Sequence, residues 1–149
     1  MVLLLAGHNH FADENPVDGI VTAQRSIITK ILARNPEAKI LVGEVIPAGK
    51  LPKYSYIPAL NSALERMVRQ LDNDNVKWVP AAEGFDWQRH TVADKVHPNR
   101  AGAEIIAANW MKALRAILPR PANEYHPDVE CYKRLDNGTS LNLHIFRPE

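Results

Sequence analysis

The order in which apolar runs and amphipathic stretches alternate limits this chain to very few folds. Short apolar runs occupy residues 2–6, 39–46 and 76–79, and helical periodicity lies between and after them. The predicted order is therefore strand, helix, strand, helix, strand, loop, helix. Runs that are apolar throughout are typical of strands buried on both faces of a parallel sheet, which is the expectation for residues 2–6. The pattern predicts an α/β fold with right-handed crossovers.

Three amphipathic stretches supply the predicted helices. Turn or proline signals end them at Asn35-Pro36, at residues 72–75 and before Pro119. Their apolar positions recur every three or four residues. They are Ile20, Ile27, Ile28 and Ile31 in the first stretch, Ile57, Leu60, Leu64, Met67, Val68 and Leu71 in the second, and Ala101, Ile105, Ala108, Met111, Leu114 and Leu118 in the third.

The charge balance argues against polyanionic partners. The 149-residue chain has 18 Lys and Arg against 17 Asp and Glu, a formal net charge of +1. No nucleic acid partner is therefore expected. No membrane span is expected either, because no apolar stretch approaches the roughly 20 residues that a spanning helix needs. The single cysteine, Cys131, provides no disulfide framework and leaves the compartment open.

The C-terminal residues have a different character. We expect residues 1–118 to form the main domain, residues 119–128 a linker and residues 129–149 a β-hairpin tail. Alternating apolar positions flank Asn137-Gly138, the dipeptide that best fits a primed two-residue turn. The tail weakly resembles the opening hairpin of α/β-hydrolase esterases, so it is either the start of a second domain or a plain hairpin that packs on the first.

Two side chains that could form part of a catalytic triad lie between the third strand and the last helix. Asp94 precedes His97 by three residues, so its carboxylate can accept the ring N–H and orient the other nitrogen as a general base. The alternative is a surface pair at a helix start, with Asn99 as the N-cap. An isolated Asp-x-x-His pattern favours that alternative.

A second motif, Gly7-His8-Asn9-His10, directly follows the first apolar run. Gly7 permits a tight turn, and Asn9 can aim its amide N–H at a site above the sheet, where it could stabilise an oxyanion. The alternative is an ordinary turn. His8 and His10, with Asp13 or Glu14, make a metal site conceivable, although no further ligand pattern supports one.

Together the two motifs resemble the SGNH/GDSL hydrolases, over residues 2–118. The resemblance implies a partial flavodoxin-like, three-layer α/β/α fold. It implies that His97 is the catalytic base, that Asp94 orients it and that Gly7 and Asn9 form the turn of the oxyanion hole. It also implies a serine esterase that needs no cofactor and acts on a small ester or an acetylated carbohydrate. Residues 36–40, 59–64 and 97–102 are likewise similar to carbohydrate-esterase-like members.

Some features depart from the family pattern. His10 stands where the family has aspartate, and His8 is unusual at the variable position. The nucleophile segment Gly-Asp-Ser and a further oxyanion glycine are expected upstream of Val2. No serine of this chain has the required strand-to-helix turn, since Ser26 and Ser62 fall in predicted helices, Ser55 in a loop and Ser140 in the tail. Cys131 lacks an adjacent base and is interpreted as an inert thiol.

Three expectations follow. Residues 1–149 alone are predicted to lack serine-esterase turnover, because the nucleophile is supplied elsewhere. The absent strand would lie beside residues 2–6, so these form an exposed apolar edge prone to self-association. The loop of residues 81–92, with Phe85, Trp87 and His90, is expected to line the pocket. The competing function is a non-catalytic remnant or an interaction module with the same fold.

Overall fold

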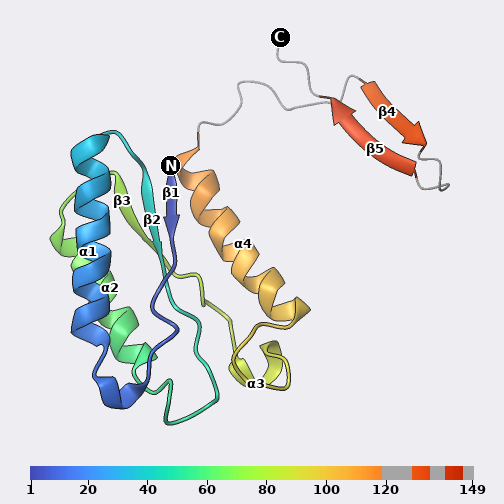
Figure 1. Cartoon of the computed structure of the whole chain (residues 1–149). Coiled ribbons are helices and arrows are strands. Elements are labelled where there is room, and N and C mark those ends of the chain that lie inside the picture. Colours follow the sequence, from blue (N-terminus) through green and yellow to red (C-terminus); the bar gives the residue numbers. More distant parts are fainter. Residues whose placement is uncertain (119–128, 135–139, 146–149) are drawn as a thin grey trace. The chain divides into compact units, whose positions relative to one another are not determined.

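A three-stranded parallel sheet forms the centre of the main unit (Figure 1). The computed structural model describes residues 1–118 and, in the C-terminal part, two strands. The sheet strands are β1 (Val2–Leu4), β2 (Ile40–Gly43) and β3 (Val76–Val79), in the order β1-β2-β3. Leu3 aligns with Leu41, and Leu41 aligns in turn with Lys77. The predicted parallel α/β sheet is therefore confirmed.

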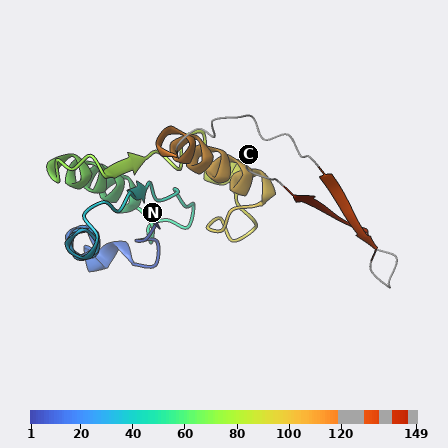
Figure 2. The ribbon, with the colours of Figure 1, turned by 90° about the horizontal axis from the view of Figure 1, so that it is seen from above.

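Helices cover both faces of this sheet, which gives the predicted three layers (Figures 1 and 2). Helices α1 (Val17–Arg34) and α2 (Ile57–Gln70) pack on one face, and α4 (Arg100–Ile117) lies on the other. The larger core joins Ile28 of α1 and Leu64 of α2 to β2, all fully buried. On the opposite face, Trp110 of α4 packs against Leu41 and Val79.

Burial differs sharply between the first two strands. All four residues of β2 are buried, as expected for a strand covered on both faces. In contrast, β1 is an edge strand of the sheet, and the side chain of Leu3 is 48% exposed. The expectation of burial on both faces is therefore wrong for β1, because Leu3 lies on the face where α4 packs against β2 and β3 and is not part of the cluster that α4 covers. The edge position itself was expected.

Two short helical segments escaped prediction. These are the 3-10 turn η1 (Ala12–Glu14) and the four-residue helix α3 (Trp87–His90). Neither is long enough to produce a hydrophobic period, so only capping could have revealed them. Asp86 supplies such a cap, because its carboxylate accepts the Gln88 N–H at 2.9 Å. Asn99 caps α4 in the same way and accepts from Gly102 N at 2.9 Å.

The C-terminal residues form a second compact unit, Leu118–Glu149. Its strands β4 (Val129–Arg134) and β5 (Ser140–Ile145) pair antiparallel, with Cys131 opposite Leu143. This pairing confirms the predicted hairpin strands. The predicted turn at Asn137-Gly138 and the predicted linker at residues 119–128 lie outside the described residues. None of the described helices is long and apolar enough to cross a membrane.

Candidate functional site

A compact loop between α3 and α4 carries Asp94 and His97. A β-bridge between Thr91 and Pro98 closes the loop, and Val92 N donates to His97 O at 2.9 Å. Between them the chain turns through Lys95, which has a φ of 60°. A left-handed residue at this point reverses the backbone and brings the two ends of the Asp-x-x-His segment together.

The side chains of Asp94 and His97 meet directly. Asp94 Oδ2 lies 2.6 Å from His97 Nδ1, while Asp94 Oδ1 accepts the backbone N–H groups of Val96 at 2.8 Å and His97 at 3.0 Å. The His97 ring and these two amides lower the pKa of Asp94 to about 2. The carboxylate therefore stays ionised and accepts a hydrogen bond from Nδ1 of His97. No described residue forms a hydrogen bond with His97 Nε2, so this nitrogen can exchange a proton with a ligand.

A pocket of about 310 Å³ adjoins His97. It lies beyond the carboxyl ends of β1 and β2, where α/β proteins commonly bind ligands. Apart from two imidazoles its walls are aliphatic. The lining residues are Leu5, Ala6, His8, Val45, Ile46, Val96, His97, Pro98 and Ile106.

The second imidazole in this pocket belongs to His8. Its ring stacks on Tyr54 with centroids 4.9 Å apart and an interplanar angle of 30°. Burial lowers the pKa of His8, the nearby Ile46 carbonyl opposes this, and the charges of His97 and Lys53 lower it further. His8 Nε2 is buried and has no hydrogen-bond partner. His8 is therefore a neutral side chain held in place in the pocket wall. The only sequence signal for such a role was that histidine is unusual at this variable position of the family motif.

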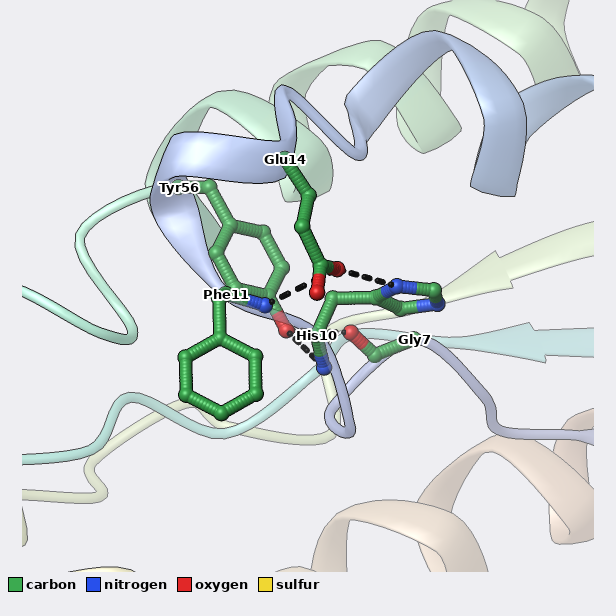
Figure 3. A network of polar contacts seen from close by, with 5 residues as sticks. All are labelled: Gly7, His10, Phe11, Glu14 and Tyr56. Atoms are coloured by element: carbon green, nitrogen blue, oxygen red, sulfur yellow. Dashed lines mark hydrogen bonds and ion pairs between the residues drawn. The ribbon is translucent and has the colours of Figure 1, made fainter.

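The turn that carries His8 is held by contacts from distant segments (Figure 3). Gly7 has a φ of 120°, and a Cβ there would lie 2.9 Å from Leu60 Cδ2, so only glycine fits without strain. Tyr56 donates its hydroxyl to Gly7 O at 2.7 Å and accepts His10 N at 3.3 Å. Glu14 Oε2 lies 3.2 Å from His10 Nδ1. His10 thus has a structural partner in the position where the family pattern has aspartate.

Asn9 is exposed between these two histidines. Its side chain is not among the residues that line the pocket beside His97. The structure therefore brings Asp94, His97 and His8 together, and it places Asn9 on the adjoining turn. Sequence reasoning missed Tyr54 and Tyr56, since nothing in their neighbourhood marks them as supports of a turn about 46 residues earlier in the chain.

The loop of residues 81–92 does not line this pocket, so that expectation is wrong. Phe85 is buried, and the Trp87 ring packs against the backbone of Gly49. His90 Nδ1 accepts the Asp86 N–H at 2.9 Å. These residues support the loop and the start of α4. Of the three rings only that of Phe85 is buried, while Trp87 lines a separate hollow beside Thr91 and Lys95.

No serine in the part of the chain with described side chains lies against His97. Ser26 and Ser55 are exposed on α1 and in a loop, and Ser62 donates to Pro58 O at 3.0 Å. Ser62 lines a separate hollow beside Glu44 and Trp78. Within the described residues, no cluster of three or more His, Cys, Asp or Glu side chains could hold a metal ion.

Comparison with known proteins identifies the family. The model of the GDSL-like lipase/acylhydrolase family matches residues 1–105. No curated protein matches the chain in sequence. Among solved structures, an acetyl esterase, crystallised as a serine-to-alanine mutant with acetate, is 26% identical with a TM-score of 0.66. The match covers 78% of this chain and 57% of that one.

Two further structures are similar. A carbohydrate esterase of family 3 from Talaromyces cellulolyticus is 28% identical, with a TM-score of 0.60 and coverage of 68% of this chain and 49% of that one. The esterase domain of a zebrafish retrotransposon ORF1 protein is 24% identical, with a TM-score of 0.60 and coverage of 68% and 60%. This chain thus spans about half to three-fifths of the structures it matches. The chain belongs to the GDSL-like lipase/acylhydrolase family.

Proposed function

We propose that residues 1–118 contribute the base half of a serine esterase site that hydrolyses short-acyl esters, acetyl esters first among them. His97 is the general base and Asp94 orients it. The observation that carries this proposal is the 2.6 Å contact between Asp94 Oδ2 and His97 Nδ1, which leaves Nε2 free beside an aliphatic pocket. A carboxylate on Nδ1 selects the tautomer whose Nε2 can accept a hydroxyl proton.

The proposed nucleophile is a serine of a Gly-Asp-Ser segment from the other part of the family fold. Two facts support this proposal: this chain spans about half to three-fifths of the matched structures, and the serines with described side chains do not lie against His97. The serine hydroxyl attacks the ester carbonyl while His97 takes its proton. His97 then returns that proton to the leaving alkoxide, and water repeats the sequence on the acyl-enzyme.

For the oxyanion we propose the Gly7–Asn9 turn. Asn9 lies on the turn that also places His8 in the pocket, and Tyr56 fixes the Gly7 carbonyl. An amide N–H or carboxamide donor held on a rigid turn stabilises developing charge without reorganising during the reaction. Asn9 therefore completes the proposed oxyanion hole together with donors supplied by the nucleophile segment.

The proposed substrate class is an uncharged ester with a short acyl group, including acetylated carbohydrates. The aliphatic walls of the pocket suit an acyl chain. Two of the similar structures are an acetyl esterase and a carbohydrate esterase. No cofactor takes part in this chemistry.

The test uses a longer protein in which the Gly-Asp-Ser segment and its strand precede Val2. A fluorophosphonate probe should label one serine, and p-nitrophenyl acetate should be hydrolysed. Replacing His97 with Ala should remove labelling and turnover together, because the serine is then not deprotonated. A folded longer protein with neither labelling nor turnover would refute the esterase and favour the non-catalytic remnant.

A further inference from the structure

We propose a second activity at the same site that needs no serine: His97 itself accepts acyl groups from activated esters, such as aryl esters and thioesters. The inference goes beyond the serine esterase, because the attacking atom is Nε2 of this chain's own imidazole. Histidine is an established nucleophile in covalent catalysis when its neighbours raise its reactivity. Three observations assign this role to His97.

The first observation is the state of the His97 ring. Asp94 Oδ2 lies 2.6 Å from Nδ1, so the proton stays on Nδ1 and the lone pair stays on Nε2. The side chain of His97 is 76% exposed, so Nε2 is open to a ligand. When Nε2 becomes acylated the ring is cationic, and the adjacent carboxylate stabilises that charge.

The second observation is the pocket beside this nitrogen. Its aliphatic lining can hold the acyl chain of the donor and place its carbonyl carbon against Nε2. Holding two reactants together increases their effective concentration. Free imidazole in solution has no such pocket and therefore lacks this advantage. Since Val45, Ile46 and Ile106 line the pocket, a longer acyl chain should react faster than acetyl.

The third observation separates His97 from the other histidines near the site. His8 shares the pocket, but its Nε2 is buried and its ring is stacked on Tyr54. His10 has a carboxylate partner, Glu14, at 3.2 Å, yet it does not line the pocket. His10 and Glu14 therefore form an imidazole–carboxylate pair like that of His97 and Asp94, but without an adjoining pocket, so His10 serves as a control.

The reaction balances without an oxidant or cofactor. Nε2 of neutral His97 forms a bond to the carbonyl carbon of the aryl ester, and the bond from that carbon to the phenolate oxygen breaks. The acyl-imidazolium is then attacked by water at the same carbon, and the carbon–nitrogen bond breaks. A carboxylate and two protons leave, and neutral His97 is restored. Only leaving groups as weakly basic as phenolates or thiolates depart from such an intermediate, so alkyl esters are not substrates.

The experiment uses the chain of residues 1–149 as it stands. Hydrolysis of p-nitrophenyl acetate and butyrate is followed at pH 8 beside N-acetylhistidine amide at equal concentration. We expect the chain to react about tenfold faster than the model compound. The butyrate-to-acetate rate ratio should be about threefold higher for the chain than for the model compound, because the pocket buries the added methylenes. Fluorophosphonate pretreatment should leave both rates unchanged.

Variants assign the rate to one ring. His97→Gln should lower the rate to that expected of the remaining histidines, each reacting no faster than N-acetylhistidine amide. His10→Gln should lower the rate by no more than the rate of one N-acetylhistidine amide. Asp94→Asn keeps the oxygen that accepts the Val96 and His97 amides but loses the charge, and should lower the rate roughly threefold to tenfold. Circular dichroism checks that each variant is folded.

Three results would overturn the inference. They are a rate no higher than that of N-acetylhistidine amide, a rate that His97→Gln does not change, and a rate that the fluorophosphonate abolishes. The last would assign the activity to a serine of this chain. It would therefore also contradict the proposed Gly-Asp-Ser nucleophile. The first two results leave that proposal untouched, because serine labelling of the longer protein is measured separately.

Discussion

Two glycines at the same place in two helices should respond in opposite ways to alanine. Gly19 and Gly102 are each the third residue of an 18-residue helix, α1 and α4. A Cβ on Gly19 would meet nothing within 4 Å. A Cβ on Gly102 would lie 2.8 Å from Phe85 Cε2 and 3.1 Å from His90 Cβ, and closer still to the His90 carbonyl oxygen.

The magnitudes follow from these surroundings. Gly19→Ala gains helix propensity at an exposed position and should stabilise the fold by about 0.5–1 kcal/mol. Gly102→Ala gains the same propensity, but the methyl group must displace a backbone carbonyl, since Cβ contacts below 3.0 Å essentially never occur. Overpacking of this kind costs about 1–3 kcal/mol, so the net effect is destabilising.

Thermal unfolding, followed by the helical signal in circular dichroism, measures both variants. At roughly 4 °C per kcal/mol for a unit of this size, Gly19→Ala should raise Tm by about 2–4 °C. Gly102→Ala should lower it by several degrees. It should also shift the NMR signals of the His97 ring, because His90 O accepts Asn99 N at the base of the loop that carries His97. If Gly102→Ala is as stable as Gly19→Ala, the packing argument is wrong.

Three further predictions concern the turn, the carboxylate and the tail. Tyr56→Phe removes the hydrogen bond to Gly7 O and should cost about 0.5–1.5 kcal/mol in urea unfolding, with amide shifts confined to residues 7–10; unchanged shifts would show that Tyr56 does not hold the turn. The pKa of Asp94 is lowered to about 2, so the stability from its pairing should be fully present above the ordinary value near 3.8 and lost as the pH falls through about 2; a carboxyl titration by NMR with a midpoint near 3.8 would contradict this. Gly138→Val should weaken the cross-strand contacts between β4 and β5 in NMR spectra, because a primed turn needs positive φ there; full retention would rule out that turn.

Local patterns predicted much of the fold. Short apolar runs that alternate with stretches of helical periodicity predicted the order of strands and helices. Proline, asparagine and aspartate residues predicted where the helices end. The contact between Asp94 and His97 was also predictable, since the two residues are three apart and a short turn brings them together. The Asn99 cap belongs to the same class. Each of these features depends on residues that are neighbours in the sequence, so the sequence determined them directly.

Only tertiary packing decided the pocket. Its walls come from the ends of β1 and β2, from the His97 loop and from α4, so no local window contains it. The same holds for Tyr56, which fixes a turn 49 residues earlier, and for His8, whose neutral state depends on burial beside Tyr54. The exposure of Leu3 was likewise decided by which part of the sheet α4 covers and not by the apolar run to which Leu3 belongs. Periodicity specifies which face of an element is apolar, whereas what covers that face depends on contacts that only the folded chain makes.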